Sequence, residues 1–336
     1  MNTANHFDTL IARIKSTVQA HELEEEGAFC RWLWQDSEEQ RDLGINPYGC
    51  ADAVNILYTL CALPKNQEKR SALAQQLQRL QNPETGLFYE STHHPIHTTA
   101  HCIAALELLD AAPLYPLHAL KPLLEKDALY DFLDRLDWLK NPWPQSHQSA
   151  GLYAALKLSG MSTPEWESWY FEWLWNEADP QTGLWRKGFV TAGQAPMYHH
   201  MGGSFHLLFN HEYAKRPLRY PDKLIDTCLA LYTQGQVPEN FGRQLNFIEM
   251  DWIYCLSRAS RQNPHRFWEC REVLLHFADS YIEYLLALHP ESDDGWNDLH
   301  MLFGAVCALA ELQQTLYGHF PSQYPLRLVL DRRPFI

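Results

Sequence analysis

Histidine, aspartate and glycine recur at near-equal intervals along this chain of 336 residues. The residue that precedes each of six apolar runs is, in order, Asp52, His101, Gly151, Gly203, Asp251 and His300. Consecutive members lie 48 to 52 residues apart, which indicates a repeated structural unit. Imidazole and carboxylate groups can transfer protons or bind metals. The alignment therefore predicts two arcs around a central space. The ionisable arc contains Asp251, His300, Asp52 and His101, and it faces a small-residue arc, Gly151 and Gly203, which leaves room for a substrate.

Two acidic residues, Glu249 and Asp251, fall within the apolar stretch Phe247–Ala259. An unpaired carboxylate is costly in such surroundings, so we predict that Asp251 lies in the site or is paired with a site residue. Paired carboxylates in a shielded cleft acquire different pKa values, which suits general acid and base catalysis. We predict Asp251 or Glu249 as the acid or base. The predicted partner bases or substrate ligands are His101, His200 and His300.

A second group of polar and aromatic residues is expected at the same end of the repeats. The predicted substrate-binding residues are Asp52, His97, His147, Tyr198, His199, Trp252, Trp296 and Asp298, and His93, His94 and His206 fall nearby. Some of these residues have a structural alternative, because an aspartate such as Asp298 at a helix start can simply cap the helix. His97 and His101 are four residues apart and could bind a metal from one helical face. The leading hypothesis needs no cofactor, and a divalent metal such as zinc is its alternative.

Alternating helix types must position these residues. The segments Cys50–Leu63, Ser149–Ser159, Met201–Asn210, Phe247–Ala259 and Asn297–Leu316 are apolar on nearly all sides, which predicts buried helices. Amphipathic segments alternate with them, beginning with Phe7–Ala20. Almost no strand pattern occurs. One geometry fits this alternation: an all-α ring in which six outer–inner helix hairpins form an (α/α)6 toroid, with residues 1–336 as one domain.

Charge and composition limit the partners. The net charge of −14 disfavours nucleic acid and anionic membranes. No apolar run is long enough to cross a membrane, and the first residues lack the pattern of a secretory signal. The eight scattered cysteines form no CxxC pair, as in proteins of reducing compartments. We therefore expect a cytoplasmic protein that acts on a small molecule.

The repeats resemble those of the α/α-toroid superfamily, which includes terpenoid cyclases, protein prenyltransferase β subunits and six-hairpin sugar hydrolases, epimerases and lyases. The turns Asn82–Phe88 and Asp293–Trp296 are similar to the acid–Gly–aromatic turns of cyclase repeats. Asp251 and His300 resemble the zinc-binding Asp and His of prenyltransferase β subunits, but Ile253 occupies the position of the expected cysteine. The three-aspartate motif of class II cyclases is absent from the sequence.

Three functions follow as hypotheses. The first is an enzyme that acts on a carbohydrate or a similar polar molecule, including uronates, by hydrolysis, elimination or epimerisation, and it predicts a wet, polar pocket. The second is a terpenoid cyclase-like or prenyl-transferring enzyme, and it predicts a funnel lined mainly by aromatic residues. The third is a non-catalytic scaffold that binds a peptide or a partner in or on the toroid, and its ionisable residues form a hydrogen-bonded core. The segment Pro321–Ile336 is expected to seal the ring, because several of its apolar residues need burial.

Overall fold

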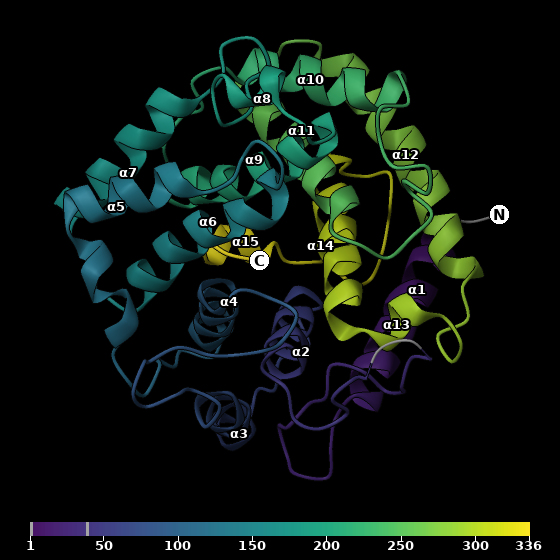
Figure 1. Ribbon diagram of the computed structural model, residues 1–336. Coiled ribbons are helices and arrows are strands. Elements are labelled where there is room, and N and C mark those ends of the chain that lie inside the picture. Colours follow the sequence, from purple (N-terminus) through teal and green to yellow (C-terminus); the bar gives the residue numbers. More distant parts are fainter. Residues whose placement is uncertain (1–2, 38–39) are drawn as a thin grey trace.

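The computed structural model describes residues 3–37 and 40–336, and its regular structure there is helical (Figure 1). The helices are α1 (Thr3–Ala20), α2 (Pro47–Thr59), α3 (Gln67–Gln78), α4 (Pro95–Leu108), the 3₁₀ helix η1 (His118–Leu124), α5 (Lys126–Arg135), α6 (Pro142–Leu158), α7 (Pro164–Glu177), α8 (Phe189–Ala192), α9 (Met197–Tyr213), α10 (Pro221–Thr233), α11 (Ile248–Gln262), α12 (Phe267–Ala287), α13 (Asp294–Asn297), α14 (Leu299–Thr315) and α15 (Val329–Arg332). Extended segments in these two ranges form only isolated bridges, such as Ala178 with Trp185. The all-helical prediction is therefore confirmed.

Six helices are buried along most of their length and pack against one another in a cycle. They are α2, α4, α6, α9, α11 and α14. Each contacts the next in this order, and α14 contacts α2. Figure 1 shows these helices around the middle of the molecule, with α3, α5, α7, α10 and α12 farther out. The five segments predicted to be apolar on nearly all sides thus lie in five of these surrounded helices, and α4 is the sixth.

The first helix packs beside the last long outer helix. α1 contacts both α12 and α2, although α12 lies more than 240 residues later in the chain. The apolar stripe of α1, from Phe7 to Val18, is buried. Burial of such a stripe supplies most of the stability of an amphipathic helix. None of the helices in the described ranges is long and apolar enough to span a membrane.

Prolines mark several helix starts, and this corrects one predicted boundary. The sequence predicts a buried helix that starts at Ser149, but α6 begins at Pro142. Proline has a fixed φ and no N–H, so the first helical turn tolerates it well. Helix α6 therefore begins two turns earlier than predicted and includes His147.

Two matching turns contain a glycine that no other residue can replace without strain. The side-chain oxygen of Asn82 accepts hydrogen bonds from the backbone N–H groups of Glu84 and Thr85, and Asp179 does the same in the second turn. Gly86 ends the first turn with φ +77°, and a Cβ there would overlap the carbonyl oxygen of Pro116. The turn thus fastens one connecting loop onto another.

We expect Gly86→Ala to lower the free energy of unfolding by about 2–4 kcal/mol, because it adds both a left-handed alanine and a steric overlap. Gly160→Ala is the matched control: Gly160 has φ +71°, but no atom lies within 4 Å of its added Cβ. The control should cost only about 1 kcal/mol. Urea unfolding followed by circular dichroism measures both variants. Equal losses in the two would contradict the role assigned to the Pro116 contact.

The segment before Ile336 packs against the inner helices. Leu326, Leu330, Phe335 and Ile336 are all buried, which confirms that the apolar residues of this segment need burial. α15 contacts α2 and α9 on opposite sides of the ring. The segment therefore lies across the middle of the helices rather than on their outer surface.

Candidate functional site

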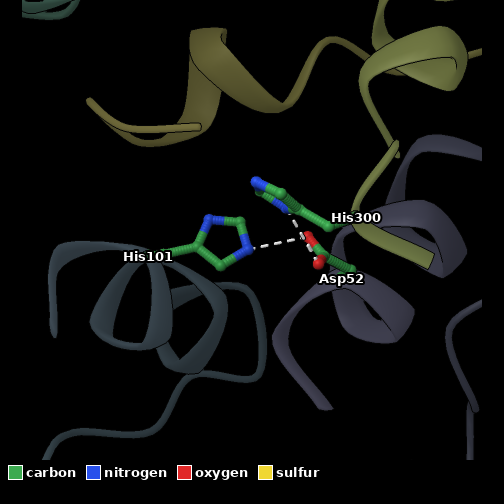
Figure 2. A group of neighbouring side chains, drawn as sticks. All are labelled: Asp52, His101 and His300. Carbon is green, nitrogen blue, oxygen red and sulfur yellow. Dashed lines mark hydrogen bonds and ion pairs between the residues drawn. The ribbon is translucent and has the colours of Figure 1, made fainter. Parts of the chain in front are cut away.

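Three buried side chains from three inner helices meet at one point (Figure 2). The Asp52 carboxylate on α2 lies between His101 of α4 and His300 of α14. His101 Nε2 is 2.7 Å from Asp52 Oδ1, and His300 Nδ1 is 3.1 Å from Asp52 Oδ2. The ligand atoms of all three lie within 4.8 Å of one another, and no other group of this kind occurs in the described ranges. The repeat alignment predicted these three residues at equivalent positions.

Helix capping fixes the position of His300. Asp298 is the N-cap of α14, and its Oδ1 accepts a hydrogen bond from the backbone N–H of His300. Arg31 binds both carboxylate oxygens of Asp298 at 2.9 Å. This bidentate pair is buried and defines the direction in which the helix begins. The cap function considered for Asp298 is confirmed.

The electrostatics favour an ionised carboxylate between neutral rings. Burial alone would raise the pKa of Asp52, but the charges of His300 and His101 and their hydrogen bonds hold it below its usual value. Burial lowers the pKa of His300 to about 4, against the opposing effect of Asp52. Burial also lowers the pKa of His101. At neutral pH the ionised Asp52 can only accept hydrogen bonds, so His300 donates from Nδ1 and its Nε2 keeps a free lone pair.

A cavity of about 200 Å³ adjoins this cluster. Its lining residues are His93, His97, Trp143, Pro144, His147, His206, Asn246, Phe247, His300, Met301 and Ile336. Five of these eleven residues are histidines, and Trp143 and Phe247 are the two other aromatic residues. His300 belongs to both the cluster and the cavity wall. It therefore connects the buried Asp52 to the space in which a ligand would bind.

The structure brings together only part of the predicted site. His300, His97 and His147 line the cavity, and Asp52 and His101 lie behind His300. The ring centroids of His97 and His147 are 4.4 Å apart. His97 also stacks on His101, with ring centroids 6.3 Å apart. Of these two histidines, His101 belongs to the group of possible metal ligands around Asp52.

Asp251 and Glu249 are buried but do not line the cavity. Asp251 lies against Trp143: its Oδ2 and the indole nitrogen are 2.9 and 3.1 Å from the point where a Cβ on Gly202 would be. Burial raises the pKa of Asp251, and the charge of Glu249 raises it further. Glu249 accepts hydrogen bonds from the Gly242 N–H and the Gln244 amide instead of facing a ligand. The predicted pairing of Asp251 with His300 is not formed, because Asp52 occupies that position.

The other predicted residues lie away from the cavity wall. His200 packs against Gly193, and His199 contacts Trp143 from outside with ring centroids 5.8 Å apart. Tyr198 stacks edge-on against His199. Trp252 is buried and packs against Tyr232 of α10 and Phe277 of α12, two outer helices. Trp296 is fully buried in α13, the short helix before α14.

The small-residue arc is filled by other parts of the protein and is not open to a substrate. A Cβ on Gly151 would be 3.2–3.3 Å from Ile96 and Phe335, and one on Gly203 would be 2.9 Å from the carbonyl oxygen of Pro142. These glycines therefore allow neighbouring segments to approach closely. The prediction of free space at this arc was wrong, because the sequence does not reveal which segment packs against a glycine.

Several residues with clear structural roles were absent from the predicted site. Tyr48 stacks on His101 at 5.0 Å and bonds His97 Nδ1 at 2.5 Å, and Ser146 bonds His206 Nδ1 at 2.8 Å. Their only sequence signal is their place in the first turns of inner helices. Comparisons of the chain with protein-family models, with curated proteins and with solved structures give no match.

Proposed function

We propose that the helices form an (α/α)6 toroid of six outer–inner hairpins, built as one domain over residues 1–336. The closed cycle of contacts among α2, α4, α6, α9, α11 and α14 supports this architecture. So does the position of α1 between α12 and α2, which supplies a sixth outer helix. A rigid ring of this kind suits a central site, since it holds residues of several inner helices at the same level.

Within this architecture, we propose an enzyme that converts a small polar molecule, such as a carbohydrate, by acid–base chemistry. The observation that carries the proposal is the pair of Asp52 and His300, in which the buried carboxylate holds one ring nitrogen and the ring lines a cavity. A neutral imidazole whose Nδ1–H is fixed by a carboxylate has its Nε2 ready to accept a proton. His300 is the proposed general base and Asp52 its positioning residue.

His101 supports the pair from the buried side. Its Nε2–H donates to the second oxygen of Asp52, which stabilises the ionised carboxylate and limits its rotation. His101 does not line the cavity, so we assign it a positioning function rather than contact with the substrate. Replacing it should weaken the orientation of Asp52 and leave the base itself in place.

The cavity favours the sugar-type hypothesis over the terpenoid one. A volume of about 200 Å³ holds a molecule about the size of one sugar ring. Histidine is the most frequent residue type in its wall, whereas a hydrocarbon substrate calls for a wall made mainly of Phe, Trp and Tyr. A cytoplasmic location and a small-molecule substrate remain part of this proposal.

A metal-dependent enzyme is the second candidate, and one observation favours it. Asp52, His101 and His300 provide one oxygen and two nitrogen atoms within 4.8 Å of one another, a donor set that suits zinc. The metal would use His300 Nδ1 and His101 Nε2, the nitrogens that bond Asp52 in the metal-free reading. A bound metal could activate water for hydrolysis. These two nitrogens cannot bind a metal and donate hydrogen bonds to Asp52 at the same time, so the two candidates exclude each other.

Metal analysis combined with a proton-exchange screen separates these candidates. The purified protein would be analysed for metals and then incubated in D₂O with monosaccharides and glycosides, followed by NMR. We expect no stoichiometric metal and deuterium incorporation or bond cleavage in at least one compound. His300→Gln should reduce the rate by about 10²–10⁴-fold, while His101→Gln keeps a measurable part of it.

Two results would overturn the acid–base reading. One equivalent of a transition metal in the wild type, lost in His101→Gln, would establish the metal-dependent candidate instead. Ligand binding without exchange or cleavage of any compound would favour the non-catalytic scaffold. His199→Gln is the control, because His199 lies outside the cavity but near Trp143. Its rate should equal that of the wild type.

A further inference from the structure

The hydrogen bonds around the cavity determine which atoms its histidines offer to a ligand. This inference rests on the proposed function, because it concerns the substrate of the same cavity. His300 is fixed first: its Nδ1–H donates to the Asp52 carboxylate, and Nε2 is left as an acceptor. For two further rings of the wall, His206 and His93, the tautomer follows from whether the bonding partner can donate or must accept.

His206 is fixed in the same tautomer by Ser146. The Ser146 hydroxyl donates its only proton to the carbonyl oxygen of Trp143 at 2.7 Å. Its oxygen is 2.8 Å from His206 Nδ1, so it accepts a proton from that nitrogen. Burial lowers the pKa of His206 to about 3, which keeps the ring neutral. His206 therefore has its lone pair on Nε2, on a ring that lines the cavity.

His93 is held by a relay of three groups. The Thr92 hydroxyl donates to Glu90 Oε2 at 2.6 Å, and its oxygen lies 2.7 Å from His93 Nδ1. Burial would raise the pKa of Glu90, but hydrogen bonds from His93 and Thr92 and the charge of Arg31 lower it to about 2. Because Thr92 gives its proton to this carboxylate, His93 donates from Nδ1. In the neutral ring, Nε2 is again the acceptor.

The remaining wall contains no charged side chain. No lysine, arginine, aspartate or glutamate is among the residues of the described chain that line the cavity. Arg31 is engaged with Asp298, Glu90 and Thr92 instead. Asn246 supplies an amide, whose oxygen already accepts a bond from the N–H of Phe247. Tyr48 can donate to His97 or accept from it, so that bond fixes no tautomer.

We propose that the cavity binds a neutral polyhydroxylated ring compound, and that it discriminates against the corresponding carboxylates and phosphates. Hydroxyl groups of the ligand would donate to Nε2 of His93, His206 and His300. A carboxylate or phosphate has only acceptor atoms to offer these lone pairs and finds no cation on the wall, so its desolvation is not repaid. An ammonium ligand is disfavoured because no carboxylate faces the cavity.

The apolar part of the wall suits such a ligand as well. It is formed by Trp143, Pro144, Phe247, Met301 and Ile336, which offer surfaces for the C–H groups of a sugar or cyclitol ring. The three fixed histidines come from α14, from α9 and from the segment just before α4. Acceptors on several sides of a small cavity match a ring whose hydroxyl groups point in several directions.

The first arm of the test measures the tautomers directly. Two-bond ¹H–¹⁵N NMR of protein with labelled histidine distinguishes Nδ1–H from Nε2–H rings, and His206→Gln and His300→Gln assign the signals. We expect both rings as Nδ1–H at pH 7. Nε2–H tautomers at His206 and His300 would overturn the inference, because the wall would then offer donors that suit an anion.

The second arm compares matched neutral and anionic ligands: glucose with glucuronate, and myo-inositol with inositol 1-phosphate. Titration followed by the same NMR signals should show the neutral member of at least one pair binding roughly tenfold or more tightly than its anion. Equal or tighter binding of the anions, or no perturbation of the His206 and His300 signals by any of the four, would overturn the inference. His199→Gln should bind as the wild type does. Loss of turnover in His300→Gln together with a preference for anions would retain the proposed function and reject only this substrate class.

Discussion

Lowering the pH from 7 to 5 is expected to reduce the free energy of unfolding by about 5–6 kcal/mol through three histidines alone. Burial lowers the pKa of His200 and His211 to about 4 and that of His206 to about 3. In the unfolded chain these rings bind protons below about pH 6.5, but in the folded protein they stay neutral. The unfolded state therefore takes up more protons between pH 6.5 and 4. Stability is fully present above pH 6.5 and is lost as the pH falls through this window.

Urea unfolding at several pH values between 7.5 and 5 measures this effect. The slope near pH 5 should be about 4 kcal/mol per pH unit, because each of the three rings contributes about 1.4. His211→Leu removes one ring that packs against Phe171 and Trp185, and it should lower the slope by about one third. A wild-type slope of less than about 1.4 kcal/mol per pH unit, which corresponds to one proton, would mean that these rings can be protonated in the folded protein.

Replacing Asp52 with alanine is expected to cost about 3–5 kcal/mol of stability at pH 7. The change removes two hydrogen bonds to an ionised acceptor and leaves two ring N–H groups buried without a partner. Since the folded pKa of Asp52 is lowered, the stability that it contributes is present above its unfolded pKa and is lost as the pH falls through the folded value. The penalty of the variant should accordingly shrink in strong acid.

A surface pair of the same chemistry provides the control for Asp52. Asp226 accepts hydrogen bonds from His265 Nε2 at 2.8 Å and from Arg266 at 2.9 Å, but all three side chains are more than one third exposed. Asp226→Ala should cost less than about 1 kcal/mol. The difference between the two variants, measured by urea unfolding, isolates the effect of burial. Similar losses would indicate that water or another group replaces Asp52 beside the rings.

The repeat alignment predicted the arrangement of the inner helices better than it predicted the site. It identified Asp52, His101 and His300 as equivalent residues, and they meet in space because α14, α2 and α4 are neighbours in the ring. By the same logic Asp251 on α11 should have joined them, but it lies against Trp143 and Gly202. A spacing of about 49 residues fixes the level of a residue in the ring and leaves open the direction of its side chain.

Other parts of the site depended on contacts between distant segments. Arg31 reaches Asp298 from 267 positions away, and Phe335 fills the space beside Gly151. Periodicity within a repeat contains no information about such contacts, because they join connecting loops and the last segment to the ring. The tautomers of His206 and His93 likewise depend on Ser146 and Thr92, whose hydroxyl directions only coordinates reveal.

The closed cycle of inner helices also determines when the site can form during synthesis of the chain. Five of its six neighbour contacts join inner helices that follow one another in sequence, so they can form as the polypeptide emerges. The contact of α14 with α2 cannot, since it joins Asp52 to His300 across 248 positions. The entropy lost on closing so long a loop grows only logarithmically with its length, but non-local contacts of this kind slow folding. A ribosome-bound chain can therefore hold Asp52 against His101 well before His300 exists, and the proposed base is the last part of the site to arrive.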